Sequence, residues 1–279
     1  MLFLILAVLS SALVSITMRL SDTKIQNNIG MLAANYLMCL ALSVGYAGFD
    51  LFPAVQGLSL ARNLGIINGI LYLAGFVLLQ WNIRKNGVVL SATFMKLGLL
   101  VSMVVSVVFF REMPGLSQWL GFAMAVAAIV LMNYHPSGEK AGSLIWLVVL
   151  LLAGGSADAM SKVFEELGNP VLSDHFLVYT FMIAFALCGV LNVVQKPSKL
   201  GKWEWLFGLT IGIPNFFSAK FMLAALETVP AVIVYPFFSV GAILVVTLAG
   251  VCFFRERMEK RQWVALALIL VALVLLNLE

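Results

Sequence analysis

FFREMPGLSQWLGFAMAVAAIVLMN occupies residues 109–133 and returns as FFRERMEKRQWVALALILVALVLLN at residues 253–277. The two copies align without a gap at an offset of 144 residues, and 11 of the 25 positions are identical. A period this long in a chain of 279 residues indicates two homologous halves and not a stack of small repeats. Each copy is a short charged turn followed by about 20 apolar residues, the length of a helix that crosses a bilayer.

The composition predicts an integral membrane protein. Hydrophobic residues make up 62% of the chain and charged residues 11%, whereas soluble domains have about 45 to 50% apolar and about 25% charged residues. The charges gather in brief clusters between apolar runs, as they do in loops at the edges of a bilayer. The net charge of +4 therefore does not indicate nucleic-acid binding. We expect the apolar run after Met1 to be a retained first span, because no basic segment precedes it.

Apolar runs of 17 to 25 residues predict an all-α membrane protein with ten transmembrane helices. The runs are continuous and do not alternate with polar residues, which excludes the strands of a membrane barrel. The predicted spans are residues 2–20, 30–48, 63–83, 88–110, 116–134, 143–163, 174–194, 203–226, 231–254 and 262–278, with a loop at His135 to Gly142.

The count of five spans in each half has a topological consequence. An odd number of spans places the second half upside down relative to the first, so we predict two inverted five-helix repeats, residues 1–134 and 143–279. Inverted repeats are a common build of secondary transporters, which bind substrate near the midplane and work by alternating access. Further correspondences between the halves are Tyr36 with Tyr179 and Arg19 with Lys162.

These features resemble one known family. The order of ten spans, the two halves, and a span ending in FFRE before a Gln-Trp helix are similar to the drug/metabolite transporter (DMT) superfamily, EamA-domain branch. The resemblance covers the whole chain and implies a basket of helices around a central cavity that carries small metabolites, amino acids or drugs. It also implies that both termini are cytoplasmic, whereas the loops after odd-numbered spans hold most of the Lys and Arg, which would place the termini outside.

Three charged side chains lie at least one helical turn from either end of a predicted span. A charge in the hydrocarbon region costs about 2.5 to 3.5 kcal/mol on insertion scales, so such residues usually face a cavity or a partner. Lys96 and Lys220 are candidate substrate-facing cations, with a structural ion pair or a snorkelling side chain as the alternative. Asp158 is a candidate proton acceptor or counter-ion, with an i, i+4 pair to Lys162 as the alternative. We expect Lys96 and Lys220 to face one electropositive cavity.

Neutral polar residues near helix breaks are further candidates for substrate binding. Pro214 and Pro236 each free a carbonyl one turn earlier in a span, and that carbonyl needs another partner or a cavity. The candidates are Asn68, Tyr72, Thr93, Asn215 and Tyr235.

The sequence supports a transporter of a small polar metabolite, anionic or zwitterionic because of the two lysines. The alternatives are proton-coupled efflux of amines or drugs through Asp158, and flipping of a lipid-linked substrate. No catalytic residues, cofactor or metal site are expected, since Cys39, Cys188 and Cys252 lie in apolar runs without ligand spacing. We expect a bacterial cytoplasmic (inner) membrane protein, a monomer or a homodimer, whose partners are a small-molecule substrate, the lipid bilayer and protons, with no nucleic acid.

Overall fold

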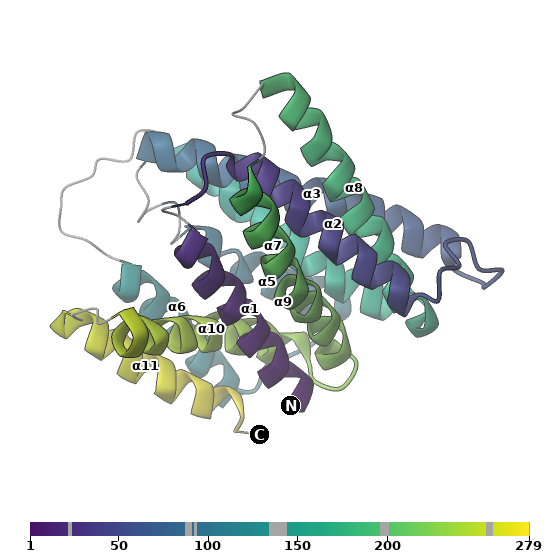
Figure 1. Cartoon of the computed structure of the whole chain (residues 1–279). Helices are drawn as coiled ribbons and strands as arrows, with labels where there is room; N and C mark the ends of the chain where they lie inside the picture. Colours follow the sequence, from purple (N-terminus) through teal and green to yellow (C-terminus); the bar gives the residue numbers. More distant parts are fainter. Residues whose placement is uncertain are drawn as a thin grey trace. The chain divides into compact units, whose positions relative to one another are not determined.

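The computed structural model describes residues 1–21, 24–86, 91, 94–133, 144–195, 201–254 and 259–278. Within these ranges it consists of helices and turns and contains no strand. The helices are α1 (Leu2–Ser21), α2 (Asn28–Tyr46), α3 (Leu58–Asn86), α5 (Leu99–Phe110), α6 (Leu116–Asn133), α7 (Leu144–Leu167), the short η1 (Pro170–Leu172), α8 (Ser173–Gln195), α9 (Lys202–Leu226), α10 (Ala231–Phe254) and α11 (Lys260–Leu276) (Figure 1). Seven of the helices in these ranges are long and apolar enough to cross a membrane, and Phe94–Phe109 and Leu116–Met132 are shorter apolar helical segments.

The predicted fourth span, residues 88–110, differs from the helix that the structure shows. Residues 94–96 are helical, a turn follows at 97–98, and α5 begins at Leu99. The backbone N–H groups of Gly98, Leu100 and Val101 donate to carbonyls three residues earlier, so the chain tightens here instead of continuing as an α-helix. Residues 88–90, and the predicted loop at 135–142, lie outside the described ranges, and the count of ten spans stays a prediction.

The chain divides into two compact units that do not coincide with the two sequence repeats. One unit contains Ala74–Lys162 and Ala225–Glu279, and the other contains Leu2–Leu73 and Val163–Ala224. Each unit therefore combines helices from the first half of the sequence with helices from the second half.

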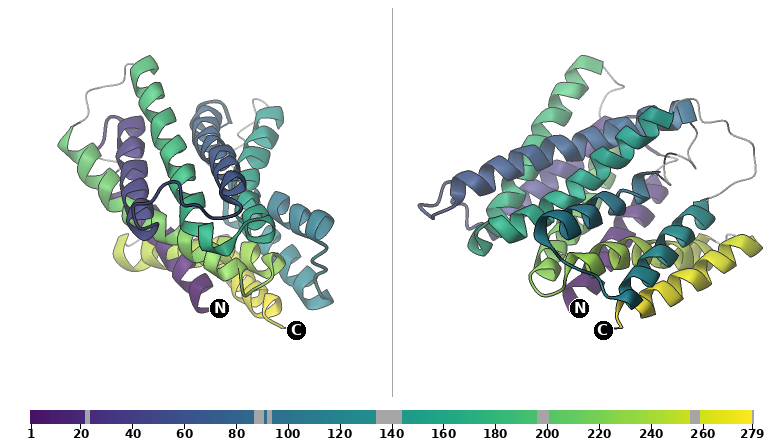
Figure 2. Two further views of the ribbon diagram at one scale, coloured as in Figure 1. Left: turned by 90° about the vertical axis from the view of Figure 1, so that its right-hand side faces the viewer. Right: turned by 180° about the vertical axis from the view of Figure 1, so that it is seen from behind.

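In the first unit, the two copies of the repeated stretch pack against each other. Helices α6 and α11 lie side by side (Figure 2). The Ser117 hydroxyl, at the start of α6, donates to the carbonyl of Leu278, just after α11, over 3.0 Å. A Cβ on Gly121 would lie 3.0 Å from Leu276 and 3.1 Å from the carbonyl oxygen of Ala272. The start of one helix thus meets the end of the other, so the repeat-related helices run antiparallel, as an inverted arrangement predicts.

The glutamine that recurs in the repeat caps the first turn of both helices. The side-chain oxygen of Gln118 accepts the backbone N–H of Gly115 over 3.0 Å, and that of Gln262 accepts the N–H of Glu259 over 2.9 Å. Each glutamine satisfies a donor that has no partner inside the helix at its first turn. The tryptophans that follow, Trp119 and Trp263, are both exposed, as expected of anchors at the membrane interface.

In the second unit, glycines on α3 and α9 allow close contact with α8 and α2. A Cβ on Gly65 or Gly69 would lie 2.8 or 2.5 Å from a carbonyl oxygen of α8, and one on Gly208 or Gly212 would lie 2.5 or 2.7 Å from a carbonyl oxygen of α2. Small residues four positions apart let membrane helices approach at backbone distance. The two pairs are separated by 143 residues, so both halves of the sequence use the same device.

Candidate substrate site

Lys96 and Asp158 lie together in the first unit. Their charged groups interact electrostatically. Both side chains are also exposed, although both residues belong to strongly apolar helical segments. Charged groups at such positions usually face water or a partner because the hydrocarbon does not solvate them. The interaction with Lys96 is compatible with a counter-ion role for Asp158. The choice among counter-ion, proton acceptor and partner of Lys162 stays a prediction.

Two glycines bring this pair together. A Cβ on Gly155 of α7 would lie 2.2 Å from the carbonyl oxygen of Gly98, and a Cβ on Gly98 would lie 2.9 Å from the backbone nitrogen of Gly155. No side chain fits between the two backbones at this crossing. The Ser102 hydroxyl donates to the carbonyl of Gly155 over 3.1 Å and fixes the contact. Since Lys96 precedes Gly98 by two residues and Asp158 follows Gly155 by three, the crossing brings the two residues into one region, where their charges interact.

Tyr235 joins α10 to the same point. Its hydroxyl donates to the backbone carbonyl of Asp158 over 3.0 Å, and its side chain is buried. The next residue, Pro236, lies inside α10 and cannot donate a backbone hydrogen bond. Tyr235, Asp158 and Lys96, three of the predicted site residues, thus come from three different helical segments and meet in one place.

One turn further along α7, Lys162 belongs to a second charge cluster. Its ammonium group lies 2.8 Å from the Glu112 carboxylate, and its side chain is only 3% exposed. The other carboxylate oxygen of Glu112 accepts the backbone N–H of Val232, at the start of α10, over 3.2 Å. Lys162 also lies 5.8 Å from the centre of the Phe110 ring. The ion pair shown for Lys162 is therefore with Glu112 of the repeated FFRE motif. A pair of Lys162 with Asp158 stays a prediction.

Lys220 has a partner that the sequence analysis did not consider. Its ammonium group forms an ion pair with Asp174, in the first turn of α8, and lies 4.3 Å from the centre of the Tyr46 ring. Asp174 is the first residue of the predicted span 174–194, and the structure places it in the first turn of α8. Lys220 and Lys96 belong to different units. A cavity shared by the two lysines stays a prediction.

Two predicted site asparagines make hydrogen bonds between helices of the second unit. The Asn68 amide nitrogen donates to the Thr180 hydroxyl over 3.4 Å, and the Asn215 amide nitrogen donates to the side-chain oxygen of Asn35 over 3.2 Å. Asn68 is buried, and its side-chain oxygen has no hydrogen-bond partner among the described residues. These amides hold α3 to α8 and α9 to α2, and their role in substrate binding stays a prediction.

The remaining candidates are less informative. Tyr72 makes an edge contact with Phe181, with ring centres 6.3 Å apart. Thr93 lies outside the described residues. Cys39 and Cys188 are buried and Cys252 is exposed. In the part of the chain that the structure describes, His, Cys, Asp and Glu side chains form no group of three that could hold a metal ion.

The ion pair of Glu112 with Lys162 joins two positions that are charged in both halves of the sequence. Glu112 is repeated as Glu256, and Lys162 corresponds to Arg19, so a charged residue at both positions recurs in the two halves. Glu256 lies outside the described residues. By contrast, Gly98, Gly155 and Asp174 carry no such repeated pattern, and their roles depend on which helices meet in space.

The fold and the comparisons with known proteins place the chain in a class. It is an integral membrane protein built from two sequence repeats. Residues 1–134 and 141–278 each match the EamA-like transporter family, and the chain belongs to this family. The resemblance inferred from the sequence is thereby confirmed.

Two similar proteins extend over nearly the whole chain. An uncharacterized protein of Haemophilus influenzae is 22% identical over 280 residues, which cover 94% of this chain and 93% of that protein. A solved crystal structure matches with a TM-score of 0.80 and 14% sequence identity, over 99% of this chain and 95% of that chain. At this identity the likeness shows the fold alone.

Proposed function

We propose that this protein is a secondary transporter of a small zwitterionic metabolite. Lys96 binds the carboxylate of the substrate, and Asp158 binds its ammonium group. The observation that carries the proposal is the exposed, electrostatically coupled pair of opposite charges on two apolar helical segments. A zwitterion offers both charges at short separation, which matches a site that presents one cation beside one anion.

Energetics support a ligand role over a purely structural role for this pair. The pair of Glu112 with Lys162 is largely shielded from solvent, and removal of one partner of such a buried pair is strongly destabilising. Lys96 and Asp158 are instead exposed and can exchange water for substrate charges. Hydrogen bonds to charged groups contribute about 1.5 to 3 kcal/mol each. Loss of either contact should therefore weaken binding by roughly 10- to 100-fold.

The antiparallel packing of repeat-related helices supports transport by alternating access. Helices α6 and α11 run in opposite directions, and the same holds for α5 and α10, because Glu112 after the end of α5 contacts Val232 at the start of α10. Inverted repeats can exchange conformations, so that a site between them opens first to one side and then to the other. The proposed transporter has ten spans in two inverted repeats. Asn68, Tyr72, Thr93, Asn215 and Lys220 are candidate further contacts for the substrate.

A ligand-stabilisation screen of the purified protein tests the substrate class. Each trial metabolite is compared with two matched analogues, one with the amine acylated and one with the carboxylate amidated. We expect the zwitterion to raise the melting temperature more than either analogue. Lys96→Met should remove the preference for a free carboxylate, and Asp158→Asn should remove the preference for a free amine. Equal stabilisation by all three compounds would contradict the proposal.

Proton-coupled efflux of amines is the second candidate, and the exposed carboxylate of Asp158 within α7 favours it. In that case cationic compounds should stabilise the protein best, and Lys96→Met should strengthen their binding by removing a repelling charge. Loss of proton-driven transport in Asp158→Asn, with folding intact and with no preference for zwitterions in the wild type, would support efflux over the first proposal.

A further inference from the structure

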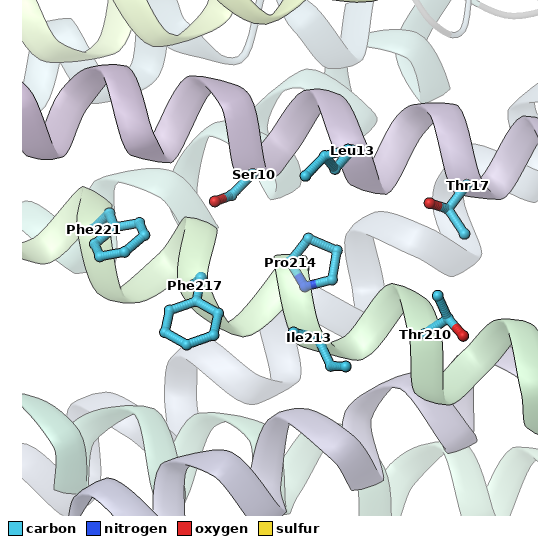
Figure 3. A pocket seen from close by; sticks show the side chains of 8 residues that line it. All are labelled: Ser10, Leu13, Thr17, Thr210, Ile213, Pro214, Phe217 and Phe221. Atoms are coloured by element: carbon cyan, nitrogen blue, oxygen red, sulfur yellow. The ribbon is translucent and has the colours of Figure 1, made fainter.

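A groove of about 440 Å³ lies between α1 and α9 in the second unit. It is lined mainly by apolar side chains, and Figure 3 shows Thr17 and Thr210 at one end and Phe221 at the other, with Pro214 between the two helices. Leu13 and Ile213, which also line it, are exposed. Both helices are candidate membrane spans, so these exposed apolar side chains lie where lipid acyl chains can contact them.

Two lysines converge on one tryptophan beyond the threonine end of the groove. The Lys24 ammonium lies 4.5 Å from the centre of the Trp203 ring and 5.9 Å from that of Phe207. The Lys202 ammonium lies 5.4 Å from the same Trp203 ring. Both lysines are exposed. Both ammonium groups lie near the same ring, so an anion bound at this place would be attracted by two positive charges.

The nearby carboxylate of Glu204 is not the anion that the two exposed lysines would bind. One of its oxygens accepts the backbone N–H groups of Gln26 and Asn27, over 2.9 and 3.3 Å, and the other accepts the N–H of Gly201 over 3.0 Å. Glu204 is buried, whereas the lysines extend to the surface. The charge of Glu204 therefore fixes the backbone at the start of α2, and among the described residues of the cluster the exposed charges are those of the two lysines.

We infer that this place is a binding site for an anionic phospholipid. Lys24 and Lys202 bind the phosphate, Trp203 lies at the level of the glycerol backbone, and one acyl chain runs into the groove between α1 and α9. The occupant follows from charge and location together: the groove opens on two membrane spans, and the cations stand at the ends of the same two spans. Basic side chains at the membrane surface attract anionic lipids in this way.

The dimensions agree with one leaflet of a bilayer. With a rise of 1.5 Å per residue, Thr210 lies about 10 Å along α9 from Trp203, and Pro214 lies about 16 Å from it. Half of the hydrocarbon thickness is about 15 Å. A chain whose headgroup is held by the two lysines therefore enters the groove between Thr17 and Thr210 and reaches the midplane near Pro214.

Native mass spectrometry and thermal stability of the full-length protein in detergent test this site. The probes are phosphatidylglycerol and phosphatidylcholine with identical acyl chains. We expect the wild type to retain phosphatidylglycerol more tightly, and the double variant Lys24→Gln, Lys202→Gln to lose about fivefold in affinity for each lysine. Thr17→Phe, which fills the entrance of the groove, should weaken retention of both lipids.

Lys85→Gln is the matched control. Lys85 lies 4.4 Å from the centre of the Trp81 ring at the end of α3, and this single lysine on a tryptophan does not border the groove. Its removal should leave retention unchanged. Equal affinity for the two lipids, unchanged affinity in the double lysine variant, or equal stabilisation by glycerol phosphate without acyl chains would each overturn the inference. The site is independent of the proposed substrate.

Discussion

Asp158 and Lys162 lie one turn apart on α7 but differ in their solvent exposure. Lys162 is almost completely buried, with its ammonium 2.8 Å from Glu112, and that carboxylate also accepts the N–H of Val232. Asp158 is exposed and interacts with an exposed Lys96. The first cluster has its hydrogen-bonding capacity used by protein groups, whereas the second can take up a ligand. A charged residue within a membrane span therefore indicates a binding site only if its charged group is accessible to a ligand.

The largest expected effect is on stability, from loss of the Glu112 carboxylate. Glu112→Ala removes the carboxylate that lies 2.8 Å from the buried Lys162 ammonium, and breaking one side of a buried pair costs about 3 to 5 kcal/mol. We expect a strongly lowered melting temperature or poor expression. The double variant Glu112→Leu, Lys162→Met removes both charges and should recover most of that loss. A double variant as unstable as the single variant would show that the ion pair is not the cause.

Gly155→Ala is expected to cost less, but it tests the crossing that places Lys96 beside Asp158. The added methyl would lie 2.2 Å from the carbonyl oxygen of Gly98, and overpacking of this kind costs about 1 to 3 kcal/mol. The adjacent Gly154 is the control, because its nearest neighbour would be 3.9 Å away. Gly154→Ala should be neutral or stabilising through helix propensity. Similar melting temperatures for both variants would contradict the close approach of α5 and α7.

Lys220→Met should have a small effect on stability. The pair of Lys220 with Asp174 is partly accessible, with side chains 27% and 24% exposed, and exposed ion pairs contribute at most about 1 kcal/mol. We also expect little change in substrate affinity, since the ammonium is already neutralised. Denaturation and ligand-binding curves of the variant measure both quantities. A loss of affinity as large as that of Lys96→Met would restore Lys220 as a principal substrate contact.

Much of the helical architecture can be predicted from the sequence, because bilayer thickness imposes long apolar runs. The predicted spans at 2–20 and 231–254 nearly coincide with α1 and α10. The turn at 97–98 was missed, because its cause is the packing of Gly98 on Gly155, which no local pattern reveals. The internal repeat, with an odd number of spans between its copies, predicts that α6 and α11 run antiparallel.

The candidate site could be predicted only in part. The cost of a charge in the membrane singles out Lys96, Lys220 and Asp158 in the sequence, and the structure shows an electrostatic interaction or ion pair for each. Neighbours along one helix predict a pair of Asp158 with Lys162. The interactions of Asp158 with Lys96 and of Lys162 with Glu112 depend instead on which helices cross. Asp174 was overlooked because it stands at the first turn of α8, where a charge has no evident cost.

The central claim is that Lys96 and Asp158 together bind the substrate, and a charge exchange tests it most directly. Binding of the zwitterion identified in the screen is measured for Lys96→Asp, for Asp158→Lys and for the double variant that carries both changes. We predict that each single variant, with two like charges at the site, loses binding by at least about 10-fold, and that the double variant regains a substantial part of it. Single variants that bind as well as the wild type, with folding intact, would contradict the account.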